Sequence, residues 1–175
     1  MDRPLPNTYW VIPGRLLAGE YPLGADDADA RRRLALLGDA GVDYFVDLTE
    51  EGELPGYRHL LPAHMQHVRS AIADTWVPKN TAQMQHILSD IRAAVGLGRC
   101  IYVHCRAGIG RTGTVVGCFL AEEGGDGKAA LKLLNRLWRQ SERAKTWPKV
   151  PQTAEQADYI RRWPKLGKPV RQHAP

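Results

Sequence analysis

Apolar positions along the chain follow two alternating patterns: short continuous runs, and longer stretches with an apolar residue every three or four positions. The short runs predict strands at residues 9–12, 16–18, 42–48, 67–69 and 100–104. The second pattern is clearest over residues 81–95, where Asn80 is a suitable N-cap and one helix face is apolar, formed by Met84, Ile87, Leu88, Ile91 and Val95. Further helices are expected over residues 26–37, from Thr112 onward, over 129–139 and over 153–162. Strands that alternate with helices predict an α/β fold, a single domain with a central, mostly parallel sheet flanked by helices.

The chain of 175 residues has the length of one domain. We expect this domain to span residues 1–163, and residues 164–175, rich in Pro, Gly and Lys, to form a basic, mobile tail. No apolar run approaches the roughly 20 residues that span a bilayer, so no membrane span is expected. The first residues lack the apolar block of a secretory signal, and three cysteines are too few for a disulfide framework. These features favour a cytoplasmic protein, and we expect a monomer.

The net charge of +5 is unevenly distributed. From Lys128 onward the chain carries 12 of its 24 Lys and Arg residues but only 3 of its 19 Asp and Glu residues. Such a basic region steers anionic partners toward the protein, or it is simply a solvated helix face followed by a basic tail. Aromatic residues are not interleaved with the basic ones, so no nucleic-acid partner is expected.

The segment from His104 to Gly113, with the sequence HCRAGIGRTG, joins a predicted strand to a predicted helix through a glycine-bearing loop. A loop of this kind directs several backbone N–H groups and a helix N-terminus at one point, where they bind a tetrahedral oxyanion. Cys105 lies at the mouth of the loop, and the amides and the helix dipole favour its thiolate form. Arg111 adds a guanidinium fork for two oxygens of a phosphate. The segment therefore predicts nucleophilic transfer of a phosphoryl group.

The string His-Cys-x-Ala-Gly-x-Gly-Arg-Thr-Gly resembles the phosphate-binding loop of the cysteine-dependent protein phosphatases, the protein-tyrosine and dual-specificity superfamily. The resemblance implies a small dual-specificity phosphatase fold that uses no cofactor and no metal. It implies that Cys105 is the nucleophile, that Thr112 hydrogen-bonds the sulfur and helps it leave the phosphoenzyme, and that His104 orients the loop. The residues that it implies for phosphate binding are Arg106, Ala107, Gly108, Ile109, Gly110 and Arg111.

The proton donor is expected on a different segment. Asp74 lies 31 residues before the nucleophile, between an extended stretch and a capped helix, and this context resembles the mobile general-acid loop of the same superfamily. Asp47 and Asp90 compete for the role, but the first ends a predicted strand and the second lies inside a predicted helix. Asp74 would protonate the leaving oxygen and then activate the water that cleaves the thiophosphate. The carboxylate that holds Arg111 is expected to come from one of two neighbours, Glu50 or Glu51.

The segment Pro151-Gln152-Thr153-Ala154-Glu155-Gln156 is similar to the glutamine-bearing loop of tyrosine-specific phosphatases. The similarity implies that Gln152 positions the hydrolytic water, with Gln156 as a supporting residue. The same segment also has the pattern of a capping box, in which Thr153 and Gln156 begin a helix. The two interpretations are compatible.

These residues predict a phosphoric monoester hydrolase that acts on phosphotyrosine in proteins, and on phosphoserine and phosphothreonine too, because no aromatic loop that deepens the pocket is found. Phosphoinositides or inositol polyphosphates are the alternative substrates. Arg106 resembles a basic residue of some phosphoinositide-directed relatives, whereas Ile109 is apolar where the best-known lipid phosphatase has a second lysine. Two other classes are an inactive phosphate-binding module and a rhodanese-like sulfur transferase. The first is disfavoured because every catalytic group is present, and the second because it explains neither Asp74 nor Gln152.

Overall fold

The computed structural model describes residues 1–166, and in them a five-stranded sheet has the order β1-β2-β5-β3-β4. The strands are β1 (Thr8–Ile12), β2 (Leu16–Gly19), β3 (Tyr44–Asp47), β4 (Gln66–Arg69) and β5 (Ile101–His104). β1 pairs antiparallel with β2, and the other three pairings are parallel. The predicted α/β domain with a mostly parallel sheet is confirmed. Because β5 lies between β2 and β3, the segment after β5 leaves the sheet between their carboxyl ends.

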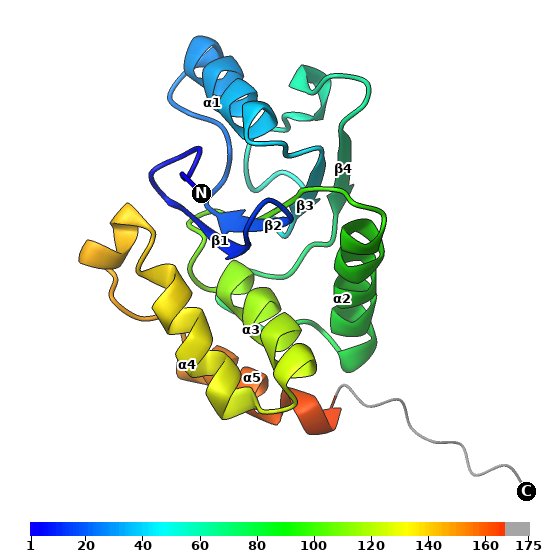
Figure 1. The fold of residues 1–175 in the computed structure, drawn as a ribbon, viewed down its shortest axis with the longest axis vertical. Helices are drawn as coiled ribbons and strands as arrows, with labels where there is room; N and C mark the ends of the chain where they lie inside the picture. The colour runs from blue at the N-terminus through cyan, green and yellow to red at the C-terminus, as the bar shows by residue number, and fades with distance from the viewer. Residues whose placement is uncertain (167–175) are drawn as a thin grey trace, which may run out of the picture.

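Helices lie on both faces of this sheet (Figure 1). They are α1 (Asp27–Asp39), α2 (Thr81–Gly96), α3 (Arg111–Gly124), α4 (Gly127–Trp138) and α5 (Ala154–Leu166), with 3₁₀ turns at Arg58–Leu60 and Glu142–Lys145. α1 covers one face, and α2 to α5 form a layer on the other. Side chains just before three helices set where they begin, because Asp26, Asn80 and Asp126 each accept a hydrogen bond from a backbone N–H of the first turn.

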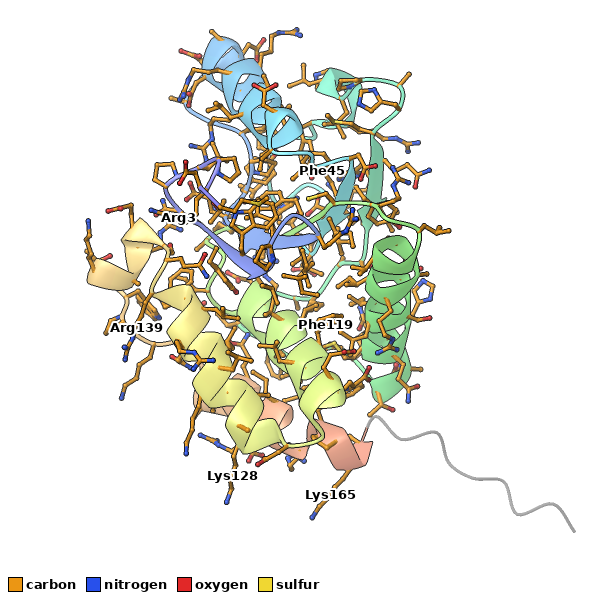
Figure 2. All side chains as sticks on the ribbon, in the orientation of Figure 1. Arg3, Phe45, Phe119, Lys128, Arg139 and Lys165 are labelled. Carbon is orange, nitrogen blue, oxygen red and sulfur yellow. The ribbon has the colours of Figure 1, made fainter. Side chains whose placement is uncertain are left out.

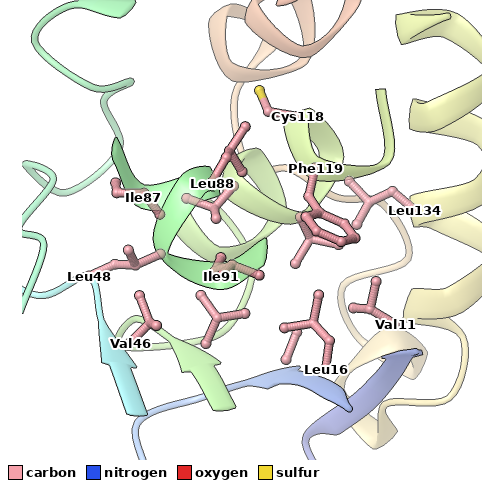
Figure 3. Packing of buried hydrophobic residues seen from close by; sticks show 14 of the residues in the cluster. Val11, Leu16, Val46, Leu48, Ile87, Leu88, Ile91, Cys118, Phe119 and Leu134 are labelled. Atoms are coloured by element: carbon pink, nitrogen blue, oxygen red, sulfur yellow. The ribbon is translucent and has the colours of Figure 1, made fainter. Parts of the chain in front are cut away.

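Two apolar clusters hold the sheet between the layers. In the larger cluster, Ile87 and Ile91 of α2 face Val46 of β3 (Figure 3). The smaller cluster lies under α1 and contains Leu37 and Phe45, the second of which is labelled in Figure 2. Strands buried on both faces have continuous apolar runs, which is why the sequence predicts them without an alternating pattern.

The last helix is longer than the sequence predicts. α5 continues through Pro164 to Leu166, whereas the pattern predicts a helix end near residue 162 and a mobile tail from residue 164. Trp163 is fully buried, and its indole Nε1 donates a hydrogen bond to Glu122 of α3 at 3.0 Å. This packing offsets the tendency of proline to end a helix. The remainder of the predicted tail, residues 167–175, lies outside the described residues.

Candidate active site

The loop Cys105–Gly110 connects β5 to α3, as the sequence predicts. Cys105 is 3% exposed and follows the last residue of the central strand. The parallel strands β2, β3 and β4 end at the same edge of the sheet, so the segments that follow them surround this loop. That edge is where ligands bind in open parallel sheets.

The carbonyl groups of the loop are held outward by neighbouring segments. The backbone N–H of Tyr21 donates to the carbonyl of Arg106 at 3.0 Å, and Arg143 Nη1 donates to the carbonyl of Ala107 at 2.7 Å. The carbonyl of Gly110 accepts from the N–H and the hydroxyl of Thr114, both at 2.9 Å. The C=O of one residue and the N–H of the next point in opposite directions, so these bonds direct the N–H groups of Ala107, Gly108 and Arg111 away from the segments that hold the carbonyls. Within residues 1–166, no N–H from residue 106 to residue 110 donates to another protein group.

Gly108 allows the loop to pack closely against the end of β2. Its φ is +75°, which side chains other than glycine rarely adopt. A Cβ at this position would stand 2.6 Å from the carbonyl carbon of Gly19 and 2.9 Å from the backbone nitrogen of Glu20. The glycine of the motif is therefore needed both for its backbone conformation and for this contact.

Arg111 is 1% exposed and is fixed by a carboxylate that the sequence does not single out. Glu53 accepts from Nη1 and from Nη2 of Arg111, both at 2.7 Å, in a bidentate pair. The carbonyl of Ile72 accepts a further bond from Nη1 at 3.1 Å. The prediction that Glu50 or Glu51 holds Arg111 is wrong, because the turn after β3 brings the third acidic residue of that segment to the guanidinium and leaves the other two exposed.

The charges at this pair stabilise each other. The Arg111 guanidinium lowers the pKa of Glu53 from 4.5 to about 2. Burial opposes the charged form of Arg111, but its hydrogen bonds to Glu53 and the proximity of Cys105 and Asp74 hold the pKa of Arg111 above its usual value. Glu53 also accepts a bond from Arg106 Nε at 3.3 Å. One carboxylate therefore binds both Arg106 of the loop and Arg111 at the start of α3.

Asp74 lies beside the same guanidinium, on the segment between β4 and α2. Its Oδ1 is 3.1 Å from Arg111 Nη2, and its side chain is 53% exposed. The next residue, Thr75, has a φ of +65°, and its N–H donates to Asp74 Oδ1 at 3.0 Å. The structure thus brings Asp74 to the loop from a surface turn.

The competing carboxylate Asp47 is fully buried and fully hydrogen-bonded. Its oxygens accept from Thr49, from His67 at 3.1 Å and from Arg69 at 3.1 Å. Burial alone would raise the pKa of Asp47, but the bonds from His67 and Thr49 lower it well below 3.8. A carboxylate held ionised in this way is unsuited to donating a proton, and Asp90 lies within α2.

Both interpretations of the glutamine segment have support in the geometry. The capping box is present, with Gln156 N–H bonded to Thr153 Oγ1 and Thr153 N–H bonded to Gln156 Oε1, both at 3.1 Å. Gln152 also lies beside the loop, because its Oε1 is 3.0 Å from where a Cβ of Gly110 would stand. The buried Gln156 reaches the segment of Asp74 too, and donates through Nε2 to the carbonyl of Trp76 at 3.0 Å.

His104 supports the loop from inside the sheet. Its Nδ1 lies 3.4 Å from the carbonyl of Cys105, and its Nε2 lies 2.6 Å from the hydroxyl of Tyr57. A carbonyl only accepts hydrogen bonds, so we assign the proton to Nδ1, and Nε2 accepts from Tyr57. Burial lowers the pKa of His104 from 6.5 to about 4, which keeps this ring neutral.

Three supporting residues, Glu53, Tyr57 and Arg143, are absent from the sequence prediction. Each reaches the site across more than 30 residues, so spacing gives no signal for them.

Two of the predicted site residues have buried polar atoms without a hydrogen-bond partner among residues 1–166. These atoms are the Thr112 hydroxyl oxygen and Arg111 Nε. In the same range no group of three His, Cys, Asp or Glu side chains is arranged to hold a metal ion, and no helix has the length and apolarity to cross a bilayer.

A protein-family model matches the part of the chain that forms the site. The family model described as "Swiss Army Knife protein, DSP-PTPase phosphatase domain" (PTP-SAK) matches residues 5–161, from the segment before β1 into α5. The chain belongs to this family. Every segment that contributes to the site lies within the matched range of this PTP-SAK domain.

The PTP-SAK domain is also similar to curated proteins. A protein named as a candidate tyrosine phosphatase, 067L of Invertebrate iridescent virus 3, is 41% identical over 117 residues, which are 64% of this chain and 45% of that protein. The dual specificity protein phosphatase CDC14AB of Danio rerio is 29% identical over 124 residues, 63% of this chain and 18% of that protein. The chain spans less than half the length of these relatives.

Solved structures share the architecture of the PTP-SAK domain. The active form of Tk-PTP superposes with a TM-score of 0.74 at 24% identity, over 91% of this chain and 97% of that one. Kinase associated phosphatase superposes with a TM-score of 0.72 at 18% identity, over 87% and 86% of the two chains. At these low identities the superpositions show the fold alone. They confirm the predicted dual-specificity phosphatase-like architecture.

Proposed function

We propose that this chain is a cysteine-dependent phosphatase domain that hydrolyses phosphotyrosine in proteins, and phosphoserine and phosphothreonine as well. The observation that carries the proposal is the loop after β5. Cys105 lies at its start, its N–H groups from residue 106 to residue 110 have no acceptor among residues 1–166, and Arg111 is fixed beside it by Glu53. Family membership and the viral relative named as a tyrosine phosphatase support it.

In the first step of the proposed reaction, the Cys105 thiolate attacks phosphorus and the bond to the leaving oxygen breaks. The loop N–H groups and Arg111 stabilise the charge on the nonbridging oxygens. Asp74 gives its proton to the leaving oxygen, so the products are an alcohol or phenol and a cysteinyl phosphate. The contact between Asp74 and Arg111 at 3.1 Å supports this role, because it places the carboxyl beside the bound phosphate.

In the second step, water attacks phosphorus and the S–P bond breaks, which regenerates the thiolate. The Asp74 carboxylate takes a proton from this water. Gln152 orients the water, a role supported by its place beside Gly110. The buried Thr112 hydroxyl, which has no partner among the described residues, would donate to the departing sulfur.

Hydrolysis of para-nitrophenyl phosphate by the purified chain tests the proposal. We expect turnover that orthovanadate inhibits and that Cys105→Ser abolishes, while the variant still binds phosphate. Turnover by Cys105→Ser close to that of the parent chain would show that another group is the nucleophile. A parent chain with no turnover would refute the proposed activity.

The contacts of Arg106 favour phosphorylated proteins over inositol phosphates as substrates. Its guanidinium is already paired with Glu53, a carboxylate that it shares with Arg111, and Ile109 adds no cation. A phosphotyrosine peptide and a set of inositol phosphates, compared by kcat/KM, separate the two substrate classes. A preference for the inositol phosphates would overturn the protein substrate.

The cellular compartment and the extent of the catalytic domain are part of the same proposal. Cys100, Cys105 and Cys118 are buried free thiols, and free thiols persist in a reducing compartment such as the cytoplasm. We infer that the catalytic domain includes α5 at least through Leu166, beyond the expected end at residue 163. That the domain is monomeric stays a prediction.

A further inference from the structure

A cleft of about 1030 Å³ lies between α4, α5 and the segment 147–153. The residues of α4 that line it lie three or four positions apart on one helix face: Lys128, Leu131, Lys132, Asn135 and, just past the helix end, Arg139. Those of α5 are spaced in the same way: Ala154, Ala157 and Arg161. Side chains at such positions lie in a row, so the cleft is a groove between two helices.

Partly buried hydrogen bonds fix the walls of the groove. Asn135 donates to the carbonyl of Val150 at 2.7 Å, and its Oδ1 accepts from the N–H of Val150 at 3.0 Å. Trp138 Nε1 donates to the carbonyl of Trp147 at 2.8 Å. These bonds attach both ends of the segment 147–150 to the last turn of α4. The groove is therefore preformed, which lowers the entropy that a ligand loses on binding.

The groove is strongly basic, and apolar residues lie between its cations. Five exposed cations line it, Lys128, Lys132, Arg139, Lys149 and Arg161. No acidic residue is among the lining residues, and none of the five cations has an ion pair within residues 1–166. Between them lie Leu131, Pro148, Val150 and the half-exposed Trp147. Figure 2 shows two of the cations, Lys128 and Arg139, at opposite ends of α4.

One end of the groove reaches the candidate active site. Gln152 lines the groove, and the same side chain lies 3.0 Å from where a Cβ of Gly110 would stand. From Lys128 to Arg139 the groove follows α4 for about 16 Å at roughly 1.5 Å per residue. An extended peptide covers that distance with about five residues.

We propose that this groove binds an acidic segment of the phosphoprotein substrate, next in sequence to the phosphorylated residue. Acidic side chains of the segment pair with the five cations, and its apolar side chains contact Leu131, Val150 and Trp147. A cleft between two helices, about as long as five extended residues, suits a peptide segment better than the flat surface of a bilayer. The link to catalysis rests on the proposed phosphatase function, whereas the binding of the acidic segment does not.

Charge reversal in the groove tests the proposal through substrate choice. We expect Lys132→Glu with Arg161→Glu to lower kcat/KM for a phosphotyrosine peptide with four flanking Asp and Glu residues by about tenfold, while turnover of para-nitrophenyl phosphate is unchanged. The peptide with Asn and Gln in those positions should not distinguish the variant from the parent. The matched control, Arg31→Glu with Arg136→Glu, reverses two exposed cations outside the groove and should leave both substrates unaffected.

Binding without catalysis separates this proposal from the proposed function. A fluorescein-labelled acidic peptide without phosphate should bind Cys105→Ser, measured by anisotropy, and lose affinity by about tenfold in the groove double variant or in 0.5 M salt. An inactive parent chain that still binds this peptide through the groove would refute only the phosphatase function. Equal affinity and equal kcat/KM for the groove variant and the parent would overturn the groove proposal. So would groove-dependent binding to phosphatidylserine vesicles without any preference for the acidic peptide.

Discussion

Glu53 binds both terminal nitrogens of Arg111 at 2.7 Å, and this pair decides where the guanidinium can meet a phosphate. We expect Glu53→Gln to lower kcat/KM for para-nitrophenyl phosphate by about 100-fold, because a small displacement of a positioning group has a large effect on rate. Glu51→Gln is the matched control, since this neighbour is exposed and has no bond to Arg111. Equal losses in the two variants would mean that the carboxylate of Glu53 does not position the arginine.

The pair of Glu53 and Arg111 should also make the free energy of unfolding depend on pH. Arg111 lowers the pKa of Glu53 from 4.5 to about 2, so the folded state favours the ionised carboxylate. The ionised carboxylate of Glu53 contributes fully to the free energy of unfolding above pH 4.5, and this contribution is lost as the pH falls toward 2. The difference in the free energy of unfolding between the parent and Glu53→Gln should therefore be constant from pH 7 to pH 5 and shrink below pH 4.5. Urea titrations over this range measure it, and a difference that grows on acidification contradicts the assignment.

Asp74 differs from Glu53 in its surroundings, because its side chain is half exposed. We expect Asp74→Asn to slow phosphoenzyme formation by about 100-fold or more with alkyl phosphates, whose leaving oxygen needs a proton. Activated aryl phosphates should be affected far less. Asp90→Asn, on α2, is the control and should behave like the parent. If alkyl and aryl phosphates lose rate equally in Asp74→Asn, the proton donor is another group.

At the scale of elements, α5 and the segment 72–79 are joined by one side chain. Gln156 caps α5 and donates to the carbonyl of Trp76 at 3.0 Å. Gln156→Met keeps the volume and removes both bonds, so we expect amide hydrogen exchange in residues 72–79 to increase about fivefold. Gln152→Met makes the same chemical change at an exposed neighbour and should leave that exchange unchanged. Unaltered exchange in Gln156→Met would show that other contacts hold the segment.

The elements themselves were largely predictable because their signals are local. Asn80 caps α2 as expected, and the apolar run before Cys105 is a buried strand. What sequence reasoning missed depends on distant contacts. The partner of Arg111 is Glu53 rather than Glu50 or Glu51, because the turn after β3 decides which of three acidic residues faces inward. Such a choice is made by tertiary packing, which spacing does not encode.

At the scale of the whole molecule, the same reasoning explains why the strand order and the end of α5 were not predictable. The order β1-β2-β5-β3-β4 depends on which strands pair across the chain, and no local pattern states it. α5 passes Pro164 because Trp163 is buried against α3 and bonded to Glu122. The groove and the loop both use α5, so this helix joins the two candidate sites of the molecule.

Because α5 packs against α3 in the core, its packing should affect the stability of the whole molecule. Trp163→Ala removes a fully buried indole, and we expect it to lower the free energy of unfolding by about 3–5 kcal/mol. For a chain of this size that is a decrease in Tm on the order of 10 °C. Trp76→Ala is the matched control, because Trp76 is 60% exposed and binds Gln156 only through its backbone, so its Tm should stay within about 1 °C of the parent. Calorimetry of both variants should give one transition, since α3, α4, α5 and the sheet share a single core. A second transition in Trp163→Ala would mean that the helical layer unfolds apart from the sheet.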